Sequence, residues 1–262
     1  MKAIDLFAGA GGFSTGAVQA GCEVLWAANH WPAAIAAHSA NHPDTVHLCQ
    51  DLHQADWTKV PAHDLLLGSP SCQGFSRARG THQPRHDVAR STAWAVVSAV
   101  ECHRPPVALV ENVPEFQKWA LFPAWSAAMQ ALGYSVSPHV VDAADCGVPQ
   151  HRVRLFVVLT KSKAPLILDL PKKPHVAARS VIDFNVGKWS LIDRPGRSKK
   201  TLMRVKAGRE RFGERFLVAY YGSVKGGRWL DRPMGTLTTS ARYGLAAGAR
   251  MRRVSIPEAT AS

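Results

Sequence analysis

The chain has 262 residues, 46% of them hydrophobic, so it can bury one large core with a smaller appendage. Its apolar runs fall short of the roughly 18 residues that a membrane-spanning helix needs, and Asp5 interrupts the apolar start, so neither a membrane anchor nor a secretion signal is expected. A formal net charge of +13 favours a polyanionic partner.

Five cysteines are spread over the sequence without the C-x-x-C spacing of zinc sites. They are Cys22, Cys49, Cys72, Cys102 and Cys146. This usage predicts neither a disulfide framework nor a metal site, and it is typical of proteins in a reducing cytoplasm.

Up to about residue 160, short apolar runs alternate with helix-like stretches, as in an α/β fold with a doubly wound, Rossmann-like parallel sheet. We expect strands at 3–7, 23–28, 65–68, 107–111, 134–141 and 155–159. Helices are expected at 14–20, 32–41, 92–102 and 122–132. The sequence therefore predicts one domain of this fold over 1–160.

After residue 161 the sequence becomes rich in Pro, Lys and Arg, and only 215–221 has the pattern of a strand. Between Lys161 and Arg215 there are fifteen Lys or Arg and five Asp or Glu, a local net charge of +10. Neutralising phosphates requires such a concentration of one sign. We therefore predict a domain boundary near 161, a small basic nucleic-acid recognition region at 161–231, and a separate last segment at 232–262.

A glycine-rich turn follows the first expected strand, with the sequence Phe7-Ala8-Gly9-Ala10-Gly11-Gly12. In a doubly wound sheet this turn is where a nucleotide-like ligand binds, because glycines let the backbone approach the ligand and helix N-terminal amides face it. On these residues alone, a nicotinamide or another nucleotide is an equally good ligand. A tight turn that ties Gly12 to Ser14 is the purely structural alternative.

One cysteine, Cys72, lies in a sharp turn directly after the strand at 65–68. A lone cysteine at a strand end is a candidate nucleophile, although most single cysteines are inert buried residues. Further along are Glu111-Asn112-Val113, at another strand end, and Gln150-His151-Arg152-Val153-Arg154. On an extended segment the two arginines would project to one side while Val153 packs inward, which suits anion recognition or pairing with acidic residues.

Taken in this order, the blocks at 4–14, 68–76, 111–113 and 150–154 resemble the DNA cytosine-5 methyltransferase family. The resemblance extends from residue 1 to about residue 258. It implies the fold of S-adenosylmethionine-dependent methyltransferases, with this cofactor held by Phe7, Gly9 and Gly11, and it places Pro70 in the same site.

The family usually ends its second strand with a carboxylate that binds the ribose hydroxyls. This chain has Asn29 at that position, which lacks charge assistance. Trp31 is placed to stack on the adenine, or else it packs in the core. Asp51 matches the acidic residue that faces the adenine amino group, or else it caps a helix.

The resemblance also implies the chemistry. Cys72 would add as a thiolate to C6 of a cytosine, and Glu111 would supply or share the proton at N3. Arg154 would hold the cytosine O2, Arg152 would support the site, and Gln150 would brace the loop.

A base inside a duplex has to be flipped out before it can react, and Gln73 and Ser76 lie on the loop that could fill the vacated space. Asn112 is assigned to the same substrate-binding set. The family usually has a proline directly before the cysteine, whereas this chain has Ser71, which loosens the backbone restriction there.

The segment 232–239 looks like the part of the family that returns from the recognition region, with Thr236 expected to touch the DNA backbone. Residues 250–258 resemble the start of the family's ninth motif, but the sequence stops at Ser262 without the final Gly-Asn-x-Val motif. We expect a second chain that supplies this motif, weak cofactor binding, or a truncated form. Candidate DNA contacts in the basic region, mainly to phosphates, are Arg194, Arg197, Lys199, Lys200 and Arg204.

The sequence thus predicts a cytoplasmic DNA (cytosine-5)-methyltransferase, bacterial or phage-encoded, that acts on double-stranded DNA in restriction and modification. The alternatives are a tRNA cytosine-5 methyltransferase of similar fold, a catalytically weak DNA-binding remnant, and one chain of a split enzyme.

Overall fold

The computed structural model describes residues 1–72, 84–162, 164–170, 172–220, 226–237 and 243–254. The chain divides into two compact units. The first comprises Met1–Val141 and Val153–Asp169, and the second comprises Asp142–Arg152 and Leu170–Ser262. The expected boundary near 161 therefore lies within the last segment of the first unit, and residues 142–152 group with the second unit.

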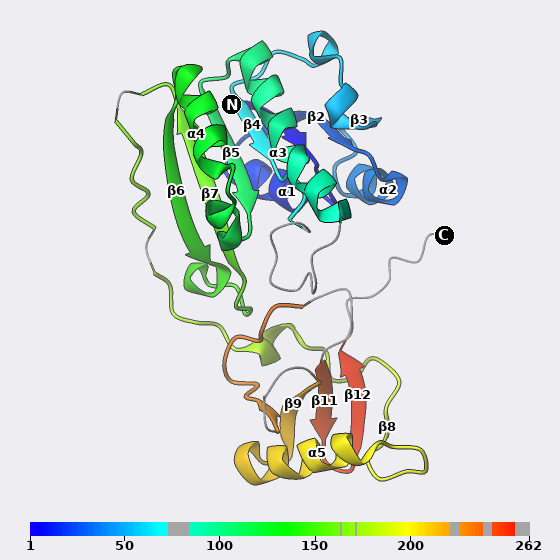
Figure 1. Cartoon of the computed structure of the whole chain (residues 1–262). Helices are drawn as coiled ribbons and strands as arrows, with labels where there is room; N and C mark the ends of the chain where they lie inside the picture. Colours follow the sequence, from blue (N-terminus) through cyan, green and yellow to red (C-terminus); the bar gives the residue numbers. More distant parts are fainter. Residues whose placement is uncertain (73–83, 163, 171, 221–225, 238–242, 255–262) are drawn as a thin grey trace. The chain divides into compact units, whose positions relative to one another are not determined.

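Seven strands form the sheet of the first unit in the order β3-β2-β1-β4-β5-β7-β6 (Figure 1). Their bounds are β1 Lys2–Leu6, β2 Glu23–Asn29, β3 Val46–Cys49, β4 Leu65–Gly68, β5 Val107–Asn112, β6 Ser135–Asp142 and β7 Val153–Thr160. The pairs within β1–β5 are parallel, and β7 runs antiparallel to β5. The predicted doubly wound α/β fold is confirmed.

The helices of the first unit cover both faces of this sheet. They are α1 Gly12–Gln19, α2 Pro32–Asn41, α3 Pro84–His103 and α4 Phe122–Ala131, with short 3-10 turns η1 Leu52–Gln54, η2 Trp57–Lys59 and η4 Pro114–Lys118. Successive strand residues face opposite sides, so Ile4 and Leu6 join the large core with α3 and α4, while Ala3 packs with Ala17 of α1. Burying one such large apolar side chain stabilises the fold by about 1.5–3 kcal/mol.

The second unit contains an antiparallel sheet in the order β10-β9-β11-β12-β8. Its elements are η5 Ala143–Cys146, η6 Ala178–Val181, β8 Ser190–Leu191, α5 Lys199–Phe212, β9 Arg215–Ala219, β10 Gly227–Arg228, β11 Tyr243–Ala247 and β12 Arg250–Val254. Only β9 had been expected. Two of the missed strands are two residues long, and β12 reads Arg-Met-Arg-Arg-Val, so charged side chains hide its apolar alternation.

Helix α5 packs tightly on β9 through a glycine. A Cβ on Gly208 would lie 2.0 Å from Cε2 of Phe216, so only glycine permits this approach. Ser198 caps the helix by accepting a hydrogen bond from the Thr201 amide at 3.2 Å. The solvent side carries Lys199 and Lys200, which are exposed.

None of the helices in the described residues is long and apolar enough to span a membrane.

Candidate active site

The glycine-rich turn after β1 has a left-handed backbone. Phe7 has φ 62°, Gly9 has φ 54° and Gly11 has φ 94°. A phenylalanine in this region is strained, and such strain is concentrated at functional sites. A Cβ on Gly9 would meet no atom within 4 Å, so the turn opens onto free space. Gly11 precedes α1 and has no side chain, which leaves the first helical amides to a ligand.

The end of β2 carries Asn29 and Trp31. Asn29 is buried, and its Oδ1 accepts a hydrogen bond from the Trp31 amide at 2.9 Å. Trp31 is 61% exposed, so it does not pack in the core. Asp51 caps η1, where its Oδ1 accepts from the His53 amide at 3.0 Å. These three residues come from the carboxyl ends of β2 and β3.

The loop after β4 is tied to its neighbours up to the candidate nucleophile. The Pro70 carbonyl accepts a hydrogen bond from Nδ2 of the buried Asn112 at 3.0 Å. The Ser71 amide donates to Oγ1 of Thr92 at 3.0 Å. A proline at position 71 would have no N–H for this bond, so Ser71 replaces one backbone restraint with another. Cys72 follows as an exposed free thiol.

An ion pair joins the ends of β5 and β7. Nε of Arg154 lies 2.9 Å from Oε1 of Glu111, and both side chains are about four-fifths buried, with 18% and 22% exposed. Glu111 pairs with Phe156 of β7, and Arg154 lies two residues before Phe156 on that strand. Val153 was expected to pack inward, but it is 41% exposed, because the pairing with β5 begins only at Leu155.

The segment with Gln150 and Arg152 is built into the second unit. Gln150 forms a parallel bridge with Met234, and the His151 amide donates to the Met234 carbonyl at 2.7 Å. Thr236 Oγ1 donates to the His151 carbonyl at 2.8 Å. This bond gives the Thr236 hydroxyl a partner inside the protein, where a contact with the DNA backbone had been expected.

Asp142 organises the same segment and was missed from the sequence. Its Oδ1 accepts from the Arg152 amide at 2.9 Å, and its Oδ2 lies 2.8 Å from Nδ1 of His151. Burial opposes ionisation, but the bonds from His151 and from the amides of Ala144 and Arg152 outweigh it and lower the pKa of Asp142. The available signal was its position directly after the strand expected at 134–141.

The predicted site residues fall into three groups. The first unit carries Phe7, Gly9, Gly11, Asn29, Trp31, Asp51, Pro70, Cys72, Glu111, Asn112 and Arg154. Most of them lie at the carboxyl ends of parallel strands, where ligands bind in open α/β sheets. The second unit carries Gln150, Arg152 and Thr236. Gln73 and Ser76 lie outside the described residues.

The candidate DNA-contacting residues differ in their surroundings. Arg197 is used inside the second unit, where its Nη2 donates to Ser190 Oγ and to the Leu191 carbonyl, both at 2.8 Å. Arg194, Lys199 and Lys200 are exposed, and Arg204 is half-buried. No group of three or more His, Cys, Asp or Glu in the described part of the chain is arranged to hold a metal ion.

The sequence model of the C-5 cytosine-specific DNA methylase family matches residues 1–190. Among curated proteins, the chain is 38% identical over 208 residues to the type II methyltransferase M.AgeI of Thalassovita gelatinovora, covering 74% of this chain and 47% of that protein. It is 36% identical over 164 residues to the type II methyltransferase M.HgiDI of Herpetosiphon aurantiacus, covering 60% of this chain and 52% of that one.

Solved structures share the fold at low sequence identity. A protein described as a DNA modification methyltransferase encoded within an E. coli prophage is 21% identical, with a TM-score of 0.66, covering 97% of this chain and 86% of that chain. The DNMT2 of Spodoptera frugiperda is 19% identical, with a TM-score of 0.59, covering 71% and 60%. The chain spans about half the length of the curated relatives described above.

Proposed function

The chain belongs to the C-5 cytosine-specific DNA methylase family, and we propose that it transfers a methyl group from S-adenosylmethionine to C5 of a cytosine in double-stranded DNA. The proposal includes a flipped cytosine and a covalent adduct with Cys72. The basic second unit is assigned to DNA, with Lys199 and Lys200 neutralising phosphates.

One observation carries the assignment of the chemistry to this site. The bond from Asn112 to the Pro70 carbonyl joins the end of β5 to the loop that bears Cys72. Glu111 directly precedes Asn112, so a carboxylate and a thiol come from two adjacent parallel strands. Addition to a cytosine ring requires an acid and a nucleophile, and these two adjacent strands each supply one of them.

The residues at the ends of β1 and β2 fit S-adenosylmethionine. The left-handed turn at Gly9 faces open space that a Cβ would enter, and the exposed Trp31 offers a flat apolar face for the adenine. Because Asn29 uses Oδ1 on the Trp31 amide, we assign its Nδ2 to a ribose hydroxyl. When bound there, the cofactor supplies an electrophilic methyl group.

The chain's own residues then act on the base. The Cys72 thiolate forms a bond to C6 while Glu111 shares the proton that reaches N3, so electron density moves to C5. Arg154 uses Nε on Glu111 and Nη1 on the Val153 carbonyl, and we assign Nη2 to the cytosine O2. After methyl transfer, which would leave the donor as its thioether, water takes the C5 proton, the C5–H electrons form the C5=C6 bond as the C6–Sγ bond breaks, the thiolate is restored, and the N3 proton returns to Glu111.

The test is adduct formation with duplex DNA containing 5-fluorocytosine, in the presence of methyl-labelled S-adenosylmethionine. Fluorine replaces the C5 hydrogen that a base would otherwise remove as a proton. The adduct cannot then be resolved, so the methylated base stays bound to the protein. We expect a labelled adduct with the parent chain and with Cys102→Ala, a matched control at another exposed cysteine, and none with Cys72→Ala.

The same assay separates the alternatives. DNA binding should survive Cys72→Ala, because the thiol is not needed for phosphate contacts. A labelled adduct with a 5-fluorocytosine tRNA but not with duplex DNA would reassign the substrate. DNA binding with no adduct on DNA of diverse sequence would contradict the proposed activity. An adduct with this chain alone would remove the need for the predicted second chain.

A further inference from the structure

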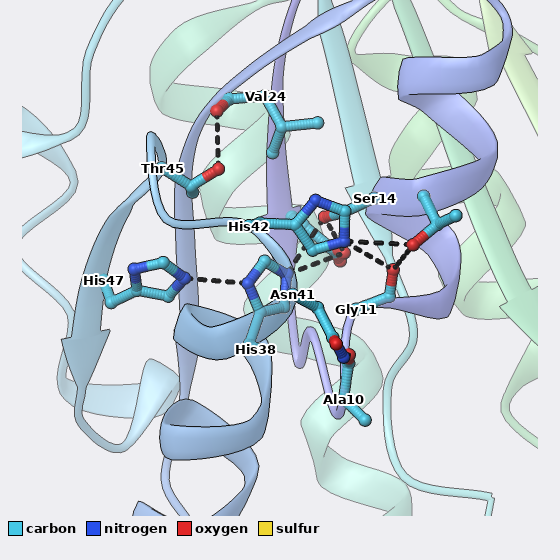
Figure 2. Close-up of polar contacts among 11 residues, drawn as sticks. Ala10, Gly11, Ser14, Val24, His38, Asn41, His42, Thr45 and His47 are labelled. Atoms are coloured by element: carbon cyan, nitrogen blue, oxygen red, sulfur yellow. Dashed lines mark hydrogen bonds and ion pairs between the residues drawn. The ribbon is translucent and has the colours of Figure 1, made fainter.

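Side chains from the end of α2 hold two carbonyls of the glycine turn (Figure 2). Asn41 Nδ2 donates to the Ala10 carbonyl at 2.8 Å. His42, the next residue, places Nε2 3.1 Å from the Gly11 carbonyl and 3.0 Å from Thr15 Oγ1. A carbonyl only accepts, so Nε2 of His42 carries the proton of the bond to Gly11. The Gly11 carbonyl also accepts from the Thr15 amide at 2.8 Å and from Thr15 Oγ1 at 2.9 Å, so α1 and the residue after α2 hold it together, while Asn41 holds the Ala10 carbonyl.

The ring of His42 also packs against bare backbone. A Cβ on Gly11 would lie 2.6 Å from Cδ2 of His42 and 3.2 Å from Cδ2 of His38. Gly11 therefore meets two requirements, a left-handed φ of 94° and contact with an imidazole. The position of the turn and the position of this ring depend on each other.

His38 supports His42 from the interior. It is fully buried, and the two ring centroids are 4.8 Å apart. Ser14 Oγ donates to Oδ2 of the buried Asp5 at 2.7 Å, so the bond of 3.1 Å between Ser14 and His38 has Nε2 of His38 as its donor. Its Nδ1 lies 2.8 Å from Nε2 of His47. The orientation of His38 is therefore fixed at both ring nitrogens.

Three neighbouring histidines could suggest a metal centre. The contacts argue against this, because Nε2 of His42 is directed at the Gly11 carbonyl and Nε2 of His38 at Ser14. Among the described residues, no group of three or more potential ligands is arranged to hold a metal ion. The cluster instead connects β1, α1, α2 and β3 behind the glycine turn.

We propose that His42 is a positioning residue for methyl-donor binding, which acts by holding the Gly11 carbonyl and so the conformation of the glycine turn, with His38 as its support. This inference rests on the proposed function, which places S-adenosylmethionine at that turn. His42 itself touches backbone and Thr15, so its effect on the cofactor is indirect.

The proposal separates cofactor affinity from the chemistry. Cys72 follows β4 and Glu111 lies near the end of β5, and the bonds described above for their surroundings come from Thr92 of α3, Asn112 of β5 and Arg154 of β7. Loss of the His42 bond should therefore weaken S-adenosylmethionine binding and leave the methyl-transfer rate at saturating cofactor unchanged. Loss of one neutral hydrogen bond corresponds to about a five- to tenfold weaker affinity.

Two substitutions of similar chemistry provide the test. In His42→Gln the amide nitrogen can reach the position of Nε2. The side chain of His42→Asn is one methylene shorter, so its amide nitrogen cannot. His139→Asn is the matched control. His139 lies on β6, and its Nε2 is also 3.0 Å from a backbone carbonyl, that of Leu166. Equilibrium dialysis with labelled S-adenosylmethionine measures affinity, and thermal unfolding checks the fold of each variant.

We expect His42→Asn to bind the cofactor about five- to tenfold more weakly, His42→Gln to stay within about twofold of the parent, and His139→Asn to match it. Equal affinity of His42→Asn and the parent would overturn the role of His42 and leave the proposed function intact. Equal weakening by both His42 variants would show a purely structural role and also overturn it. A parent chain that binds no S-adenosylmethionine would refute the proposed function, and this inference with it.

Discussion

Replacing Asn112 by leucine tests whether β5 positions the loop that carries Cys72. Asn112 is 1% exposed, and its amide satisfies the Pro70 carbonyl and the Val113 amide at 3.0 and 2.9 Å. Leucine has a similar volume but no polar group, so both partners lose their bond. Each buried group left unsatisfied costs about 1–3 kcal/mol.

Only the bond to Pro70 bears on the loop with the nucleophile. If the lost bond displaces Cys72 in the folded protein, and the cost of about 1–3 kcal/mol is added to the barrier for adduct formation, the adduct forms roughly 5- to 150-fold more slowly. The rate is measured with 5-fluorocytosine DNA on denaturing gels, and the free energy of unfolding is measured with urea. Thr92→Val is the matched control, since it removes the hydroxyl that accepts from the Ser71 amide, a half-buried group with access to water.

We expect a smaller rate loss for Thr92→Val than for Asn112→Leu. If Asn112→Leu lowered the free energy of unfolding by about 2 kcal/mol or more and left the adduct rate of the folded protein unchanged, the bond would support folding alone. The assignment of the loop position to Asn112 would then be refuted.

Glu111→Gln removes the charge that pairs with Arg154, and we expect adduct formation to fall by about 100-fold or more, the contribution typical of proton transfer; a rate within about threefold of the parent would exclude this role. Burial, and then the neighbouring His103, lower the pKa of His63 in the folded protein. As pH drops below about 6.5, His63 is therefore protonated more readily in the unfolded chain than in the folded one, and the free energy of unfolding falls. His63→Leu should therefore lose less unfolding free energy than the parent between pH 7.5 and 5.5 in urea titrations, and parallel losses would contradict it. DNA affinity should fall steeply with salt, and charge reversal of Lys199 and Lys200 should flatten that dependence; an unchanged slope would remove α5 from the interface.

The sequence predicts the strands and helices of the first unit well, because each is indicated by residues that are close together in the sequence. Alternation of apolar runs with helical stretches, punctuated by Gly9 and Gly11, is set by neighbours along the chain. The candidate site follows from the same property, since residues directly after parallel strands meet at one edge of the sheet. The family resemblance pairs Cys72 with Glu111, and their places after β4 and near the end of the adjacent strand β5 agree with that pairing, which stays a prediction.

The missed features depend on contacts between distant residues. His38 lies in an alanine-rich helix, and only the fold brings it to Asp5, Ser14 and His47. Helix α5 reads as a run of charges, and its packing becomes visible only when Phe216 is seen against Gly208. Neither the propensities nor the spacing of single residues contains this information.

The grouping of residues 142–152 with the second unit has a consequence for how such proteins can be recombined. The segment separates two strands of the first sheet, yet His151 is hydrogen bonded to Met234 and Thr236. A crossover near residue 170 that imported a foreign recognition region would keep Asp142 and His151 but discard both partners. Exchange of specificity between relatives therefore has to preserve the backbone at Met234 and a hydroxyl at position 236, or to carry 142–152 along, and a graft made with both segments should be more stable than one made with 170–262 alone.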